Sequence, residues 1–306
     1  MSILKRCLSA IGRFFLKLKI AIYKNKTPSE CVTYTIVFLL FMAISLTYVF
    51  VLFWCMISGM RSHTAVMRWP FEKMFEDLKP AQIIEVFGAI KHAKTDFWGM
   101  LINSIYFSVT SVVINLLCTA MFAYVTTKYE FPGSKLVYPI VMVMMFLPLY
   151  GSGGAEYKLY AKMNLINNPL QAIVCSTGGM GMGYLYFNAF YRGLSGTYKE
   201  AAEIDGAGEY TIFFRIILPQ AMGLMGALFL TNWIGGWNGY QGFLVYMPNL
   251  PNLAAGIYLV QDAMERKSQM HYVFGACFVV SIPPLILFAF FNKILTNNVS
   301  LGGIKE

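Results

Sequence analysis

The sequence predicts an all-α integral membrane protein with about six transmembrane helices and no separate soluble domain. Of the 306 residues, 57% are hydrophobic and only 13% are charged, whereas soluble domains carry about 25% charged residues. Several apolar runs approach the roughly 20 residues that a helix needs to cross a bilayer. In addition, the stretch from Ile216 to Gln261 contains no Asp, Glu, Lys or Arg. That stretch is about twice as long as one crossing requires.

The apolar runs are expected to form one transmembrane domain over residues 31–295. The six predicted spans cover residues 31–57, 101–126, 136–150, 169–191, 221–244 and 272–295. The uncharged segment 246–261 is expected to be a loop between the last two spans. Pro283 and Pro284 stand in the middle of the last span, where they are expected to kink it.

Residues 1–30 precede the first span and carry seven basic residues against one acid. Their apolar residues recur at helical spacing. The pattern predicts either a basic amphipathic helix on the cytoplasmic membrane surface or a positively charged flank with no further role. No cleavable signal peptide is expected, because the apolar stretch that follows is too long for one. Residues 296–306 are expected to be a short cytoplasmic tail.

An even number of spans places both termini on the same side of the membrane. With Lys293 counted in the C-terminal tail, the termini, the loop 127–135 and the segment 192–215 carry 14 Lys and Arg residues and a net charge of +7. The opposite loops carry 10 such residues and a net charge of +2. Cytoplasmic loops are enriched in Lys and Arg, so both termini and the segment 192–215 are predicted to be cytoplasmic.

The motifs of common enzymes are missing from the sequence. It contains no GxxxxGK[ST], GxSxG or HExxH pattern, and its three histidines and six scattered cysteines lack the spacing of metal ligands. We therefore expect no catalytic site, metal or cofactor. Except for Lys293 near the end of the last predicted span, the spans contain no Asp, Glu, Lys or Arg. Ion-coupled carriers usually need such groups, so a neutral solute and an external energy source are favoured.

The spans do carry aromatic, amide and hydroxyl side chains. Aromatic faces beside hydrogen-bonding amides suit a polyhydroxylated ligand. The alternative role for these side chains is helix packing or anchoring at the membrane interface. The candidate substrate-path residues are Asn103, Ser104, Asn232, Trp237, Asn238 and Tyr240.

A polar helix–turn–helix is predicted over residues 198–220, between the fourth and fifth spans. Thr197 and Glu200 have the spacing of a capping box. Gly206 is expected to break the first helix after Asp205, and Pro219 is expected to end the second. A soluble hairpin between two spans indicates a docking element for a protein outside the membrane.

The hairpin also carries a recognisable spacing. Glu200-Ala201-Ala202, Gly206, Ile216 and Leu218-Pro219 resemble the EAA-x3-G-x9-I-x-L-P motif of permease subunits of binding-protein-dependent ABC importers. Further stretches resemble the carbohydrate-uptake branch, in particular its maltose-permease (MalG) type. They are Asn103-Ser104, Ala123-Tyr124, Phe131-Pro132-Gly133, Trp237-Asn238 and the Gly-Gly-Ile-Lys ending. The resemblance covers about residues 97–306. It departs from the pattern at Ser195-Gly196-Thr197, where the family usually has a proline, and at Gly239, where an acid is common.

The resemblance implies the ABC type I importer permease fold, with residues 197–219 as a cytoplasmic coupling (EAA) loop. It implies transport of a sugar or oligosaccharide across a bacterial cytoplasmic membrane. The implied partners are a second homologous permease, two cytoplasmic ABC ATPase subunits, an extracytoplasmic solute-binding protein and membrane lipid, but no nucleic acid. The implied ATPase-coupling residues are Glu200, Ala201, Ala202, Asp205, Gly206, Ile216, Leu218 and Pro219.

Two other hypotheses stay open at this point. The importer could carry a different solute, such as an amino acid, a polyamine or a phosphate derivative. The chain could instead be a membrane scaffold or sensor whose hairpin binds a soluble regulator without transport.

Overall fold

The computed structural model describes residues 27–92, 94–147, 153–178 and 180–299, with side chains described up to Phe291. Most of the predicted N-terminal amphipathic segment and the end of the C-terminal tail lie outside these residues. The chain divides into two units, residues 1–57 and residues 58–306. Each unit is described by itself.

The first unit holds most of α2 (Pro28–Gly59), which is apolar and long enough to cross a membrane. Its start is fixed by a capping box that the sequence analysis missed. The backbone N–H of Thr27 donates to Glu30 Oε2 at 2.8 Å, and the N–H of Glu30 points back to Thr27 Oγ1 at 3.4 Å. Two backbone donors at the end of the helix thereby gain partners. Along α2, the hydroxyls of Thr35 and Ser45 donate to carbonyls of their own helix.

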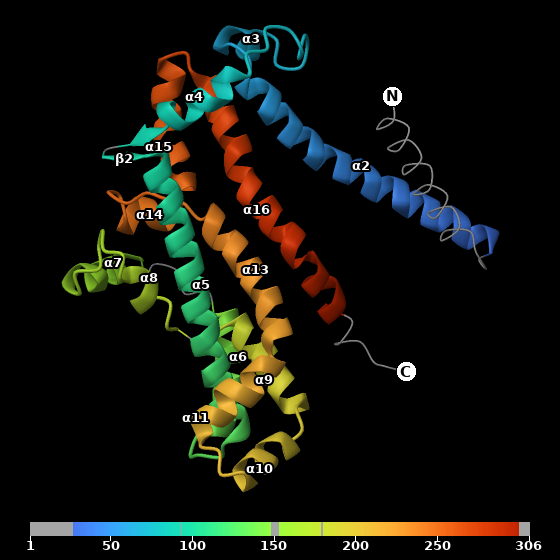
Figure 1. The fold of residues 1–306 in the computed structure, drawn as a ribbon, viewed down its shortest axis with the longest axis vertical. Helices are drawn as coiled ribbons and strands as arrows, with labels where there is room; N and C mark the ends of the chain where they lie inside the picture. The colour runs from blue at the N-terminus through green and yellow to red at the C-terminus, as the bar shows by residue number, and fades with distance from the viewer. Residues whose placement is uncertain (1–26, 93, 148–152, 179, 300–306) are drawn as a thin grey trace. The chain divides into compact units, whose positions relative to one another are not determined.

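The second unit is built on three long helices that pack in the order α5, α13, α16 (Figure 1). These helices are α5 (Phe97–Lys128), α13 (Met222–Asn238) and α16 (Met270–Val299). A fourth helix, α9 (Met182–Gly193), lies along α5. Trp233 and Trp237 of α13 stack 4.9 Å apart in the core, and the indole N–H of Trp237 donates to the carbonyl of Val280 on α16. The hydrogen bond of Trp237 thus joins α13 to α16, while the stacked rings fill the core beside α13.

Small elements cover the end of the unit where α5 begins (Figure 1). They are α3 (His63–Arg68), α4 (Ala81–Ala89), the antiparallel pair β1 (Lys91–His92) and β2 (Thr95–Asp96), α14 (Gln241–Tyr246) and α15 (Leu253–Arg266). Three further helices complete the unit: α6 (Ser134–Phe146), α7 (Gly153–Lys162) and α8 (Gln171–Val174).

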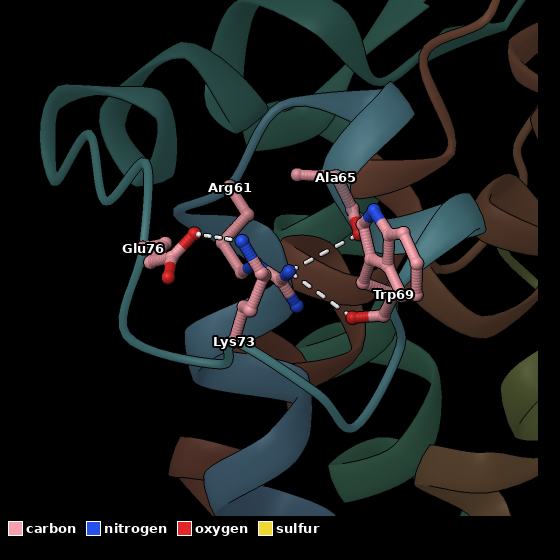
Figure 2. A network of polar contacts seen from close by, with 5 residues as sticks. All are labelled: Arg61, Ala65, Trp69, Lys73 and Glu76. Atoms are coloured by element: carbon pink, nitrogen blue, oxygen red, sulfur yellow. Dashed lines mark hydrogen bonds and ion pairs between the residues drawn. The ribbon is translucent and has the colours of Figure 1, made fainter.

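The first part of the segment 58–97, which precedes α5, folds around Arg61. This side chain is only 1% exposed. Its Nη2 donates to the carbonyls of Ala65 and Trp69, each at 3.1 Å, and thereby closes the turn that contains α3 (Figure 2). Beside it, Lys73 and Glu76 form an exposed ion pair at 3.2 Å (Figure 2).

Two predicted boundaries are wrong. Residues 169–191 do not form one helix, because the chain is irregular between α8 and α9, where glycines are frequent. The freed backbone carbonyls of Ser176 and Gly178 accept hydrogen bonds from Asn115 Nδ2 on α5. The segment 246–261 is not a loop throughout, since α15 begins at Leu253.

Three described helices are long and apolar enough to cross a membrane: α2, α5 and α16. The bent pair Glu209–Gln220 and Met222–Asn238 gives a fourth span if it is counted as one. The predicted number of six spans stays a prediction. α16 continues as a helix through Pro283 and Pro284, and the expected kink there stays a prediction as well.

Replacing Gly275 should lower stability, because α16 touches its neighbours there without a side chain. A Cβ at Gly275 would lie 2.7 Å from Val86 Cγ2, and overpacking of this kind costs about 1–3 kcal/mol. We expect the Gly275→Leu protein to melt several degrees lower in detergent. The matched control is Gly88→Leu on α4, where no atom lies within 4 Å of the added Cβ. Equal melting temperatures for the two variants would contradict this packing.

Candidate functional site

The helix–turn–helix expected from the sequence is present at the end of the second unit opposite α4 (Figure 1). It consists of α10 (Thr197–Ile204), α11 (Glu209–Thr211), the π-helix η1 (Ile212–Ile217) and α12 (Leu218–Gln220). We call residues 197–220 the hairpin. It follows α9 and leads into α13.

The start of α10 differs from the predicted capping box. Thr197 is itself helical, and Gly196 is the N-cap residue. The hydroxyl of Ser195 accepts from the N–H of Thr197 at 3.3 Å and lies 2.7 Å from its hydroxyl. Ser195, two residues before the expected Thr197, therefore provides the side chain that caps α10. The structure shows no capping hydrogen bond from Glu200 among the described residues.

The turn after α10 is a Schellman motif centred on Gly206. Gly206 has φ +76°, a conformation that a side chain disfavours. The N–H of Gly206 donates to the carbonyl of Glu203, and the N–H of Ala207 donates to that of Ala202. These two bonds satisfy carbonyls that the end of a helix leaves free. The predicted break after Asp205 is therefore explained by backbone geometry.

The second arm of the hairpin is wound as a π-helix. Its last bond runs from the N–H of Leu218 to the carbonyl of Phe213, five residues back. The side-chain amide of Gln220 donates to the carbonyl of Ile216 at 3.0 Å. Beyond this arm, the helix direction changes by 71° into α13. π-helical turns occur frequently at functional sites.

The hairpin is fastened to the long helices by its buried side chains. Ala202, Phe213 and Ile217 are each at most 5% exposed and belong to the main core. The ring of Phe213 lies 5.2 Å from that of Tyr124 on α5, and Tyr124 in turn contacts Tyr191 on α9 at 5.6 Å. A displacement of the hairpin must therefore move the ends of α5 and α9 with it.

This packing divides the predicted coupling residues into two groups. Ala202 and Leu218 are buried and Ile216 is partly buried, so these three contact the chain's own core. The other members are exposed: Glu200, Ala201, Asp205, Gly206 and Pro219. Phe214, next to the buried Phe213, is 46% exposed.

The exposed face of the hairpin includes two large apolar residues that sequence reasoning missed. Ile204 is 86% exposed and Tyr210 is 79% exposed. The small residue Ala201 and the acids Glu200 and Asp205 are exposed as well. Large apolar residues in an otherwise polar hairpin are the sequence feature that could have predicted this exposed apolar surface.

An ionic cluster joins the two arms of the hairpin to the end of α5. Lys199 lies 3.5 Å from both Glu203 and Glu209, and its ammonium group sits 4.0 Å from the centre of the Tyr129 ring. Tyr129 also donates a hydrogen bond to Glu209. Burial and this hydrogen bond raise the pKa of Tyr129 to about 12, so its hydroxyl stays protonated at neutral pH.

A pocket of about 210 Å³ lies between α5, α8 and α14, away from the hairpin. Rings, hydroxyls and one amide line it. Its principal residues are Phe107, Ser108, Ser111, Gln171, Cys175, Ser176, Phe243 and Tyr246. None of its lining residues is charged. Such a mixture of aromatic surface with a few polar groups is typical of small-molecule sites.

None of the six predicted substrate-path residues lines this pocket. Asn103 donates to the carbonyl of Pro251, and the hydroxyl of Ser104 accepts from the N–H of Leu253. These two residues clamp the segment before α15 onto α5. Trp237 is buried and donates a hydrogen bond to α16, and Asn238 donates a hydrogen bond to a carbonyl of its own helix. The ring of Tyr240 stacks on that of Tyr258, and Asn232 is exposed. Their contact with substrate stays a prediction.

Comparisons with known proteins identify the family and the fold. Residues 20–300 match the family model described as "Binding-protein-dependent transport system inner membrane component". The arabinooligosaccharides transport system permease protein AraQ of Bacillus subtilis (strain 168) is 22% identical over 87% of this chain and 94% of its own length. The diacetylchitobiose uptake system permease protein NgcG of Streptomyces coelicolor is 26% identical over 67% and 68%.

A solved structure shares the fold. It is that of a bacterial ABC transporter involved in the import of the acidic polysaccharide alginate. One of its chains superposes with a TM-score of 0.69 and 20% sequence identity, and the match covers 88% of this chain and 98% of that chain.

The geometry of the turn predicts a difference between two neighbouring glycines. Gly206→Ala places a side chain at positive φ and should destabilise the hairpin by about 1 kcal/mol. Gly208 has φ −74° and open space around it, so Gly208→Ala should be nearly neutral. Hydrogen exchange of residues 197–209 measures the difference, and we expect roughly five-fold faster exchange in Gly206→Ala alone. Equal exchange in both variants would contradict the assigned turn.

Proposed function

Because the chain belongs to the family of binding-protein-dependent transport system inner membrane components, we propose that it is a permease subunit of an ABC importer for a sugar or oligosaccharide. ATP hydrolysis then takes place on two separate cytoplasmic ATPase subunits. A second homologous permease completes the path, and an extracytoplasmic binding protein delivers the solute.

The observation that carries this proposal is the exposed face of the hairpin. Large exposed apolar side chains mark interaction surfaces. Ile204 follows Ala201 by three residues on α10 and so lies on the same side of that helix, and Tyr210 is exposed on the second arm. A small residue such as Ala201 lets a partner approach the helix backbone closely. We assign this face to a groove on the ATPase, with Glu200 and Asp205 at its polar edge.

The interior of the hairpin supplies the mechanical connection. Its buried side chains contact the ring cluster of Tyr124 and Tyr191, and Lys199 binds both arms to Tyr129. Close-packed interiors transmit displacement because they do not compress. Movement of the ATPase groove would thus reach the ends of α5 and α9 directly.

The proposed substrate class rests on the pocket and on the relatives. The pocket offers rings and hydroxyls without a charge, which suits a neutral polyhydroxylated molecule. Two relatives are named for arabino-oligosaccharides and diacetylchitobiose. An amino acid, a polyamine or a phosphate derivative would need a charged partner in the path, and none of the residues around this pocket supplies one.

The charge distribution supports an orientation. The hairpin and the loop 127–135 belong to the side with the excess of Lys and Arg, so we place them, with both termini, in the cytoplasm. The segments 58–96 and 247–269 then face the binding protein on the opposite side of a bacterial cytoplasmic membrane.

The first test concerns the ATPase contact. Ala201→Trp enlarges the exposed face without touching the core. We expect the ATPase subunit to be lost on co-purification and substrate-stimulated ATP hydrolysis to fall at least about ten-fold, because misfit at a packed contact costs about 1–3 kcal/mol. The control is Ala161→Trp, exposed on α7. Retention of the ATPase by the Ala201→Trp permease would contradict the proposal that this face binds the ATPase.

The second test concerns the pocket. Gln171→Leu removes the pocket's one amide and keeps the side chain's size. Loss of one hydrogen bond to the solute costs about 0.5–1.5 kcal/mol, so the KM of uptake should rise about two- to ten-fold with the ATPase still bound. The matched control is Gln261→Leu on α15. An unchanged KM for Gln171→Leu would remove this pocket from the path.

A further inference from the structure

A second pocket, distinct from the substrate pocket, lies where α5 and α9 end and α6 begins. Its volume is about 170 Å³. Polar atoms dominate its lining, in contrast to the ring-lined pocket near α14. We call it the interfacial pocket, defined by Thr127, Lys135, Tyr138, Tyr184, Asn188 and Arg192. None of these residues belongs to the EAA motif.

Two cations border the interfacial pocket without an ion-pair partner among the described residues. The guanidinium of Arg192 lies 4.9 Å from the centre of the Tyr138 ring, and Lys135 stands in the first turn of α6. Lys128 is nearby, but its ammonium group donates to the carbonyl of Leu194 at 2.7 Å. The lining includes one acid, Glu130. The net charge of the lining therefore favours an anion.

A buried acceptor in the same pocket has no donor. Asn188 is 2% exposed, and its Nδ2 donates to Thr127 Oγ1 at 2.7 Å and to the hydroxyl of Tyr184 at 3.4 Å. Its Oδ1 has no hydrogen-bond partner among the described residues. An unsatisfied buried acceptor is costly, so this atom is suited to a hydroxyl donated by a ligand.

The surroundings match the edge of a membrane. Tyr138, which is only partly buried, is of the residue type that gathers at membrane interfaces. The first turn of α6 adds the positive end of a helix dipole. The N-cap residue of α6 is Gly133, so no side chain of that residue fills the space at this end of the helix. Basic pockets between transmembrane helices on the cytoplasmic side bind anionic lipid headgroups.

We propose that the interfacial pocket binds a phosphate ester of a polyol, as presented by the headgroup of phosphatidylglycerol. Arg192 and Lys135 hold the phosphate, and a glycerol hydroxyl donates to Asn188 Oδ1. Its assignment to the cytoplasmic leaflet rests on the proposed function. The binding itself rests only on the side chains described.

Occupancy of this pocket has a consequence for the hairpin. Tyr129 lines the pocket, and the same ring lies under Lys199 of the ionic cluster. A bound headgroup restricts Tyr129 and thereby stabilises the contact between α5 and the hairpin. The lipid would then act as a positive effector of coupling.

The test uses the full importer complex in nanodiscs that contain phosphatidylcholine together with either phosphatidylglycerol or phosphatidic acid. Native mass spectrometry counts the lipids that remain bound after detergent washing. We expect phosphatidylglycerol to be retained at least five-fold over phosphatidylcholine. The double variant Lys135→Gln, Arg192→Gln should lose this retention. The matched control Arg266→Gln, Lys267→Gln removes the same charge at the opposite end of the unit and should keep it.

Two further arms identify the ligand. Asn188→Leu should abolish the preference for phosphatidylglycerol over phosphatidic acid, which lacks the polyol, while binding of both anionic lipids persists. Soluble glycerol 3-phosphate should displace the lipid only if a free metabolite is the natural source. Equal retention of phosphatidylglycerol and phosphatidylcholine, or equal loss in both double variants, would overturn the proposal. The Ala201→Trp permease, purified with or without the ATPase, should retain the lipid as the unchanged permease does, so failure of the coupling assignment is distinguishable from failure of this one.

Discussion

The lack of hydrogen-bond partners in hydrocarbon is the constraint on which the rest of the structure depends. Wherever the backbone leaves the helical pattern, polar side chains must replace the missing bonds. Asn115 does this for the irregular stretch between α8 and α9. Asn103 and Ser104 do it for the segment before α15, and Asn252 donates to the carbonyl of Gly239 after α13 ends. These four polar residues are explained by this requirement.

The same requirement accounts for the way the hairpin joins the helices. Its helices end in a Schellman motif and a π-helical turn, both of which leave few carbonyls unpaired. Having satisfied its backbone locally, the hairpin can attach to α5 and α9 through side chains alone. Ring contacts around Tyr124 and the ionic cluster of Lys199 form that attachment. The exposed face is left free for a partner.

Much of the hairpin could be predicted from the sequence, because its signals are local. The break at Gly206 follows from backbone geometry, and the EAA spacing identifies the family that the comparison confirms. Which helix face packs inward is not a local property, so Ala202 was expected to meet a partner and instead lies in the core. The helices differ from the predicted span 169–191 and from the predicted loop 246–261 for a related reason. A continuous helix and a broken helix can have the same uncharged apolar composition. The sequence therefore does not distinguish them when a distant asparagine, such as Asn115, donates to the free carbonyls of the broken one.

The position of α5 has an evolutionary consequence. With 32 residues and about 1.5 Å of rise per residue, it reaches from the clamp at Asn103 to the ring cluster at Tyr124, and the ring-lined pocket borders it between these points. Under the proposed function, substitutions around residues 171–176 and 242–247 can change the solute preference without altering the exposed face of the hairpin. Solute preference and ATPase contact can therefore evolve separately.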